Sequence, residues 1–236
     1  MKTAGIDGCR AGWLAVTLDR SLAAWQLLQT PTELAAYAAA KNTVFIDIPI
    51  GLSETEPVRK CDQLLRLVLG GAYASSVFSP PVRAAFLVND YTAACDINET
   101  RTGKRITKQA WNIMPKIRQV DELIAEQPAL RQVLHESHPE LLFKKLNRAG
   151  EPLPKKKTPE GVERRQKLLF SADPRTEELF TKMREGLKKS QAKDDDLLDA
   201  LVLALMAAQS PYRPVRTLPL PPETDNRGIP MAIHFV

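Results

Sequence analysis

The sequence has few of the residues that build disulfide scaffolds, zinc sites or membrane spans. Its three cysteines, Cys9, Cys61 and Cys95, are odd in number, lie far apart and include no Cys-x-x-Cys pair. This usage argues against disulfides and zinc and is typical of a reducing compartment. The longest apolar run, 197–208, is too short and too closely flanked by acids to cross a bilayer, and the first residues lack the apolar core of a signal peptide. We therefore expect a cytoplasmic protein with no membrane segment.

The charge is distributed unevenly along a chain that is long enough for one substantial core. With 236 residues, of which 44% are hydrophobic, we expect a single domain over residues 1–236. The net charge is +5, but residues 144–193 hold 15 Lys and Arg against 7 Asp and Glu, which gives +8 there and −3 elsewhere. A basic loop and helices in this stretch suit a polyanionic partner such as nucleic acid, although charge runs also form ordinary solvated faces.

The N-terminal part of the sequence predicts an α/β sheet. Residues 3–7, 13–19 and 22–28 alternate or cluster as three strands joined by short turns, which favours an antiparallel meander. Residues 31–40 follow as a helix with Thr30 as its N-cap. Residues 43–48 are almost continuously apolar, as in a central strand covered on both faces. Helices on both sides of the sheet follow from this pattern.

The rest of the chain is mostly helical by pattern. Residues 54–127 form a helical insertion after the fourth strand, and 130–136 predict a fifth strand. Ser137 and Glu140 then have the spacing of a capping box at a helix start. A last long helix begins near Lys193, and residues 231–236 predict an edge strand.

Acidic residues recur at the ends of apolar strands and inside the last helix. Asp7 ends the first strand and Asp47 lies near the end of the fourth, and a buried acid requires a cation or hydrogen-bond donors. Each also has a structural alternative, because Asp7-Gly8 fits a hairpin turn and Asp47 fits an Asx turn before Pro49. Asp199 lies beyond the first turn of the last helix among apolar residues, where helix capping does not explain it.

The start of the last helix adds further carboxylates on the same face. Asp196 and Asp199 are three residues apart, and Asp195 and Asp199 are four apart, so each pair shares a face and repels unless a cation intervenes. Asp194 or Asp195 as the N-cap, with acids in the first turn, explains part of the run without a functional role. A group of strand-end and helix acids is the ligand type that magnesium and manganese take. Two such ions can activate water and stabilise a leaving oxygen in phosphodiester hydrolysis.

Together these motifs resemble one family over nearly the whole chain. The family is the one called domain of unknown function 429, which is described as predicted nucleases of ribonuclease H-like fold. The segments that carry the resemblance are Gly5-Ile6-Asp7-Gly8-Cys9-Arg10 to Trp13, Ile46-Asp47-Ile48-Pro49-Ile50-Gly51, Ser76-Val77-Phe78-Ser79-Pro80-Pro81, Gln109-Ala110-Trp111-Asn112, His138-Pro139-Glu140, Lys156-Lys157-Thr158 and Asp195-Asp196-Leu197-Leu198-Asp199-Ala200.

The resemblance implies a ribonuclease H-like fold and a set of metal ligands. It implies a five-stranded mixed sheet with acids on strand one, on strand four and on the C-terminal helix. The implied ligands of Mg²⁺ or Mn²⁺ are Asp7, Asp47, Asp196 and Asp199, with Glu140 a further catalytic candidate and Asp195 the substitute for Asp196 if the helix register differs.

Three functional hypotheses follow. The first is a metal-dependent nuclease in which Arg10, Lys155, Lys156 and Lys157 contact phosphates. The second is a non-catalytic nucleic-acid-binding protein of the same fold. The third is a phosphoryl-transfer enzyme of actin-like fold, because Asp7-Gly8 and the following hairpin resemble a first phosphate loop. That fold needs a second glycine-rich phosphate turn, and with only 11 glycines the sequence offers none.

Overall fold

The computed structural model describes residues 1–71 and 73–236, which divide into two compact units. The first unit consists of Met1–Asp47, Ala129–Arg216 and His234–Val236. The second consists of Ile48–Pro128 and Thr217–Ile233. The second unit therefore contains the predicted insertion together with a segment close to the C-terminus.

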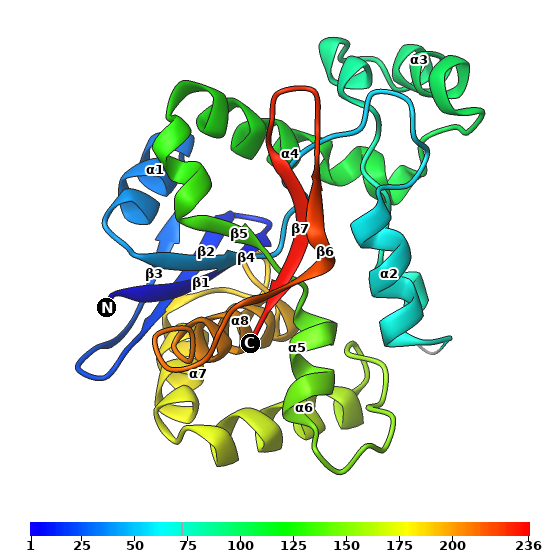
Figure 1. Cartoon of the computed structure of the whole chain (residues 1–236). Coiled ribbons are helices and arrows are strands. Elements are labelled where there is room, and N and C mark those ends of the chain that lie inside the picture. Colours follow the sequence, from blue (N-terminus) through cyan, green and yellow to red (C-terminus); the bar gives the residue numbers. More distant parts are fainter. Residues whose placement is uncertain (72) are drawn as a thin grey trace. The chain divides into compact units, whose positions relative to one another are not determined.

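The first unit is built on a five-stranded mixed sheet (Figure 1). Its strands are β1 (Thr3–Cys9), β2 (Gly12–Leu18), β3 (Ala23–Leu28), β4 (Thr43–Ile46) and β5 (Leu134–Glu136), in the order β3-β2-β1-β4-β5. The first three strands are antiparallel, and β4 and β5 run parallel to β1 and to each other. The predicted α/β class and the five-stranded mixed sheet are confirmed.

Several boundaries in this sheet differ from the prediction. The first strand continues past Asp7 to Cys9, so the alternative that Asp7-Gly8 forms the hairpin turn is wrong. The fourth strand ends at Ile46, before Asp47, and the fifth begins only at Leu134, because η3 (Pro128–Gln132) is a 3₁₀ turn. The apolar residue of that turn, Leu130, is buried, so its hydrophobicity reflects packing and not strand structure.

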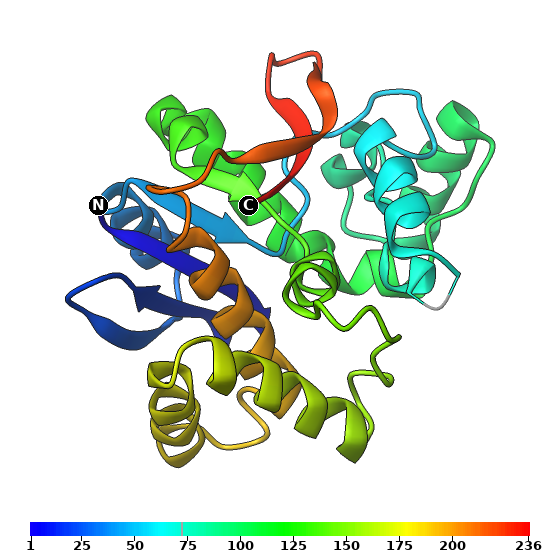
Figure 2. The ribbon, with the colours of Figure 1, turned by 60° about the horizontal axis from the view of Figure 1, so that its bottom comes forward.

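Helices cover both faces of the sheet (Figures 1 and 2). α1 (Pro31–Ala39) lies on one face, and Thr30 is its N-cap as predicted. Thr30 and Glu33 also form a capping box, in which each side chain accepts a backbone N–H of the other residue. α8 (Asp194–Ala207) lies on the other face and packs against β1, β2 and β4. The helices α5 (Pro139–Leu146), α6 (Pro159–Ala172) and α7 (Arg175–Gly186) pack in turn against α8.

Gly5 brings α8 unusually close to the central strand. A Cβ atom at Gly5 would lie 2.1 Å from the Ala204 nitrogen and 2.6 Å from the Ala200 oxygen, both in the backbone of α8. Every residue of α8 from Leu197 to Ala207 is buried. The helix is therefore the core of the unit, and it holds its polar residue Asp199 at 2% exposure among apolar neighbours.

The second unit is largely helical. It contains α2 (Lys60–Leu69), η1 (Ala74–Ser76), η2 (Arg83–Leu87), α3 (Tyr91–Thr102) and α4 (Lys108–Glu126), as predicted for the insertion, and α4 continues through Pro115. The predicted C-terminal strand is β7 (Pro230–Phe235), which pairs with β6 (Arg216–Thr224) in a separate two-stranded sheet. Within this unit, buried Arg83 forms ion pairs with Glu54, Asp121 and Asp225.

Across residues 1–71 and 73–236, no helix combines the length and the apolar character that crossing a membrane requires. Cys9, Cys61 and Cys95 are buried, and none of them forms a disulfide in the described part of the chain.

Candidate functional site

Two of the predicted acids come together near the C-terminal ends of two central strands, β1 and β4. β1 and β4 are parallel with Ile6 opposite Ile46, so Asp7 and Asp47 occupy the next equivalent positions on neighbouring strands. The Asp47 N–H donates to the Ile6 carbonyl at 3.0 Å and continues the pairing by one residue. Residues at matched positions of adjacent strands project to the same side of a sheet. Both carboxylates are therefore directed to the same side, and Asp7 is buried.

α8 brings the third acid to this place. The helix lies on β1 through the contact of Gly5 with Ala200, the residue that follows Asp199. Asp196, one turn earlier, accepts the Lys193 N–H at 2.8 Å. Lys193 is thus the N-cap, and the prediction that Asp194 or Asp195 occupies this position is wrong, because Asp196 at the third helical position already satisfies the N-cap N–H.

A lysine from a distant loop enters the same site. Lys156 Nζ donates to Asp199 Oδ2 at 2.6 Å, and the Asp199 side chain is 3% exposed. The other oxygen, Asp199 Oδ1, is buried with no hydrogen-bond partner among the described residues. The Asp199 carboxylate raises the pKa of Lys156 above its usual value, which keeps the ammonium charged.

We call Asp7, Asp47, Asp196 and Asp199 the acid cluster, because the charges of these carboxylates shift one another's pKa values. Burial, followed by the charges of Asp199, Asp47 and Asp196, raises the pKa of Asp7 well above its usual value. Burial and then Asp199 raise the pKa of Asp47 to about 7, while Lys156 acts in the opposite direction. Burial also raises the pKa of Asp196. The cluster is therefore a place where negative charge is costly and a cation is stabilised.

The loop that carries Lys156 is fixed by α6. A Cβ at Gly161 would lie 2.0 Å from the Lys155 carbonyl oxygen, so only glycine admits the loop this close to the helix start. Arg165 Nη1 donates to the carbonyls of Pro154, at 2.8 Å, and Gly161, at 3.0 Å. Thr158 caps the helix by accepting the Gly161 N–H. Arg165 was not among the predicted site residues. The sequence feature that could have indicated it is its position four residues after Gly161, at the start of α6.

Glu140 has a different place from the one expected. Both of its oxygens accept from Arg165 Nη2, at 2.9 and 2.8 Å, and both side chains are buried. A bidentate pair of this kind fixes geometry. It links α5 to α6 and so supports the Lys156 loop, although the Glu140 charge still contributes to raising the pKa of Asp47.

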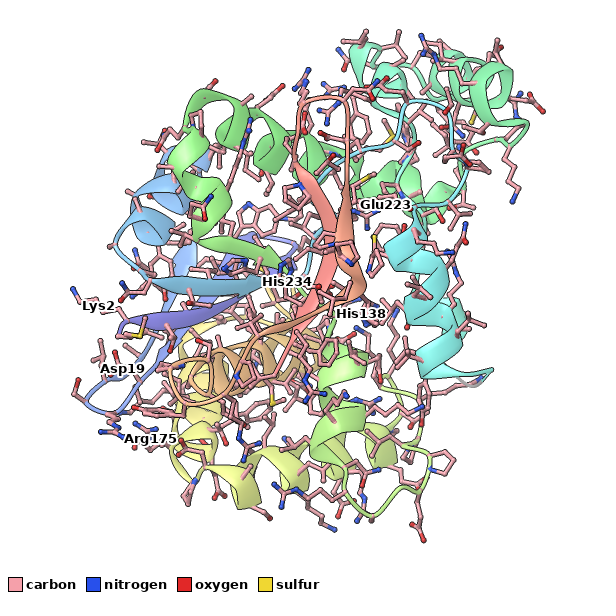
Figure 3. The ribbon with its side chains drawn as sticks, viewed as in Figure 1. Lys2, Asp19, His138, Arg175, Glu223 and His234 are labelled. Atoms are coloured by element: carbon pink, nitrogen blue, oxygen red, sulfur yellow. The ribbon has the colours of Figure 1, made fainter. Side chains whose placement is uncertain are left out.

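The predicted capping box of α5 is wrong. His138 is the N-cap of this helix, not Ser137. The Ser137 Oγ instead donates to the His234 carbonyl at 2.8 Å, and His234 Nδ1 lies 3.1 Å from the Glu136 carbonyl (Figure 3). The Ser137 side chain therefore links the end of β7 to the end of β5 and does not cap α5.

The other predicted phosphate contacts lie outside the acid cluster. Arg10, in the turn between β1 and β2, and Lys155 and Lys157, on either side of Lys156, are exposed. Asp195 lies in the first turn of α8 and acts on Asp196, whereas Asp196 itself acts on Asp7. This favours Asp196 over Asp195 as the fourth acid of the site.

The donor set of the acid cluster suits a hard divalent cation. Its donor atoms are all carboxylate oxygens, and one of them, Asp199 Oδ1, is buried without a hydrogen-bond partner among the residues that the structure describes. As placed, no three Asp, Glu, His or Cys side chains in the described ranges, 1–71 and 73–236, are arranged to hold a single ion. Ion binding therefore requires the carboxylates to close in while Lys156 moves off Asp199.

The chain belongs to a family whose model matches nearly its whole length. The model of the family described as "Protein of unknown function (DUF429)" matches residues 5–224, which is nearly the whole chain. The expected family resemblance is confirmed. Searches of curated proteins and of solved structures gave no match.

Proposed function

We propose that this protein is a divalent-metal-dependent nuclease of ribonuclease H-like fold that hydrolyses phosphodiester bonds of a nucleic acid. The observation that carries the proposal is the convergence of Asp7 from β1, Asp47 from directly after β4 and Asp199 from α8 near the C-terminal ends of the central strands. Each has a raised pKa or a cationic partner, which caps and turns do not explain. Functional sites are where such perturbed carboxylates gather.

The arrangement of the sheet supports the fold assignment. The strand order β3-β2-β1-β4-β5, with β4 and β5 parallel to β1, carries one acid in β1, one directly after β4 and one in the helix packed on them. This is the distribution that the family resemblance implies. Fold alone does not establish a reaction, so the proposal rests on the acids.

The acid cluster supplies the residues for metal chemistry. Asp7, Asp47 and Asp199 would hold Mg²⁺ or Mn²⁺, with Asp196 at the rim. The bound ion would supply an activated water and stabilise the leaving oxygen. Lys156, released from Asp199, donates to a non-bridging phosphate oxygen and orients the scissile bond. Because Asp7 and Asp199 are buried, they exclude bulk water from the side of the ion that they face.

Exposed cations near the cluster fit the phosphate backbone of the substrate. Arg10, Lys155 and Lys157 are free to contact phosphates because they are on the surface. Contacts of this kind set affinity without selecting sequence. Substrate affinity should therefore fall steeply with salt.

A cleavage screen tests the proposal. Fluorescent single- and double-stranded DNA and RNA are incubated with Mn²⁺ or Mg²⁺, with and without EDTA, in parallel with Asp199→Asn. We expect cleavage of at least one nucleic acid, which EDTA and the variant each abolish. Cleavage that persists at the same rate in Asp199→Asn would contradict the proposal.

One observation favours a second candidate, a nucleic-acid-binding protein without turnover. The Lys156 ammonium already offsets part of the repulsion within the acid cluster. In that case the protein would bind nucleic acid in a salt-sensitive manner, would show no affinity for Mn²⁺ and would cleave nothing in the screen.

A further inference from the structure

A basic pocket lies in the first unit, on elements other than those that carry the acid cluster. Its volume is about 790 Å³, and its lining includes the cations Arg148, Arg164, Lys167 and Arg213 and no acidic residue. Three parts of the chain supply these residues: the segment after α5, the outer face of α6 and the segment after α8. Four cations drawn from three segments form a site that no local sequence pattern displays.

The helix α6 contributes a continuous face to this pocket. Arg164, Lys167, Leu168 and Ser171 line it at positions i, i+3, i+4 and i+7, which share one side of a helix. Arg165, one position away, points instead into the protein toward Glu140. Arg165 thus supports the Lys156 loop inside the protein, whereas its neighbour Arg164 lines the pocket.

The charge of the pocket is almost unneutralised. Of its four cations, Lys167 alone forms an ion pair among the described residues, with Glu163, and both side chains are more than 60% exposed. Such exposed pairs contribute little and yield easily to a ligand. A second cavity of about 630 Å³ in the same unit shows the contrast. Its lining has both Lys2 and Arg175 and the acids Asp19 and Asp173, and Arg175 forms an ion pair with Asp173 (Lys2, Asp19 and Arg175 are labelled in Figure 3). Of these two cavities in the first unit, the basic pocket has the character of an anion site.

An exposed aromatic ring completes the pocket. Tyr212 lines it and is 60% exposed. The Arg20 guanidinium lies 4.7 Å from the centre of the Tyr212 ring, which holds the ring in place by a cation–π contact. Cations beside an exposed aromatic ring are the combination by which proteins hold single-stranded nucleic acid, with phosphates on the cations and a base stacked on the ring.

We propose that this basic pocket binds a single strand of nucleic acid through its phosphates and one stacked base. The inference rests on the nucleic-acid substrate of the proposed function but is independent of its metal chemistry. α6 connects the two places, since it begins at Pro159, just after the Lys156 loop, and reaches Ser171 about 18 Å further along its axis. For a strand that stays stacked as in duplex DNA, at roughly 3.4 Å per nucleotide, that length corresponds to about five nucleotides.

Fluorescence anisotropy with a labelled 12-nucleotide single strand, as DNA and as RNA, tests the pocket in the full chain. Arg164→Ser with Lys167→Ser should weaken binding at least tenfold and should reduce the dependence of log affinity on log salt. Tyr212→Leu should weaken binding about tenfold. The matched control is Lys182→Ser, because Lys182 also forms an exposed i,i+4 pair, with Glu178 on α7, and does not line the pocket. Its binding should equal that of the wild type.

Two further arms identify the source of the phosphate. A mononucleotide should compete only weakly, and a four-nucleotide strand should bind more weakly than the 12-nucleotide strand. Equal competition by a mononucleotide would overturn strand binding and assign the pocket to a free nucleotide. Wild-type affinity in the double variant, or no binding by the wild type, would overturn the pocket itself.

The outcome is separable from that of the proposed nuclease. The pocket variants should bind Mn²⁺ as the wild type does, because none of the pocket residues belongs to the acid cluster. Asp7→Asn should retain binding of the 12-nucleotide strand whether or not cleavage is observed. Loss of strand affinity in Asp7→Asn equal to that of the double variant would place the binding site at the acid cluster and overturn the pocket.

Discussion

Lys156 and Asp199, 43 residues apart in the sequence, meet at 2.6 Å, with the ammonium on a loop before α6 and the carboxylate inside α8. The same ammonium lowers the pKa values of Asp7 and Asp47, against the effect of burial. One cation therefore offsets the mutual repulsion of carboxylates from three elements. In the proposed mechanism, a divalent ion takes over this role and frees Lys156 to contact the substrate.

Replacing Lys156 should separate these two roles. In Lys156→Met the buried Asp199 loses its partner, so the free energy of unfolding in EDTA should fall by about 1–3 kcal/mol. The affinity for Mn²⁺ should rise, because no ammonium competes for Asp199. Urea unfolding and Mn²⁺ titration measure the two effects. Lys157→Met makes the same change at an exposed neighbour and should alter neither, and weaker Mn²⁺ binding in Lys156→Met would refute the competition.

The acid cluster should make the metal-free protein less stable as the pH rises. The folded-state pKa of Asp47, about 7, lies above the ordinary value of 3.8 for this side chain, so between these values the folded state binds more protons than the unfolded state. The free energy of unfolding should therefore fall as the pH increases from about 4 to 7, the window set by these two pKa values.

The comparison with Asp47→Asn isolates this contribution. Urea unfolding of both proteins in EDTA at several pH values should show a shallower fall for the variant. Titrating groups outside the acid cluster, such as His135 with its pKa lowered to about 4 by burial, are common to both proteins and cancel in the difference. Asp7, whose pKa the Asp47 charge raises, changes in the same direction as Asp47. A wild type that gains stability relative to Asp47→Asn as the pH rises would have the wrong sign for this account.

The buried pair of Glu140 and Arg165 should contribute mainly to stability. Arg165→Met leaves an unpaired buried carboxylate and should cost about 3–5 kcal/mol in the free energy of unfolding. Glu140→Gln retains an acceptor for Arg165 and should cost less, about 1–3 kcal/mol. Because both Glu140 oxygens accept from Arg165, Glu140→Gln should still bind Mn²⁺ with wild-type affinity. A loss of Mn²⁺ binding with unchanged stability would instead make Glu140 a ligand.

The sequence predicted those parts of the site that depend on local pattern. Asp7 lies within an apolar strand, Asp47 directly follows another, and Asp199 interrupts an apolar helix, so periodicity alone marks them as unusual. The family resemblance added the expectation that they converge. Their parallel register, with Ile6 opposite Ile46, is a long-range pairing that no local pattern contains.

The features that the sequence did not predict depend on contacts between distant residues. Glu140 has the spacing of a capping residue, but Arg165 reaches it from α6 and outweighs the local hydrogen bond. The basic pocket combines residues from 148 to 213, of which only the α6 face has a visible period. Lys156 was expected to contact phosphate, but its contact with Asp199 is set by the position of Gly161 against the loop.

The close packing of α8 on β1 should be sensitive to a single methyl group. Gly5→Ala places a Cβ 2.1 Å from backbone of α8, and because backbone on both sides is held by the core, the helix must shift. We expect a loss of about 1–3 kcal/mol or more in the free energy of unfolding, with weaker Mn²⁺ binding as Asp199 moves away from Asp7. Gly71→Ala, where the added Cβ meets nothing within 4 Å, is the control and should stay near wild type in urea unfolding. Equal stability of the two variants would contradict the packing argument.

The most direct test of the acid cluster is calorimetric titration of Mn²⁺ into the wild type, Asp7→Asn, Asp199→Asn and Asp195→Asn. Asp195 is the matched control, because it lies on the same helix turn as Asp196 but outside the field that acts on Asp7. The account predicts that the wild type and Asp195→Asn bind Mn²⁺ with similar affinity, and that Asp7→Asn and Asp199→Asn each lose at least tenfold. Wild-type Mn²⁺ affinity in both Asp7→Asn and Asp199→Asn would contradict a shared metal site on β1 and α8.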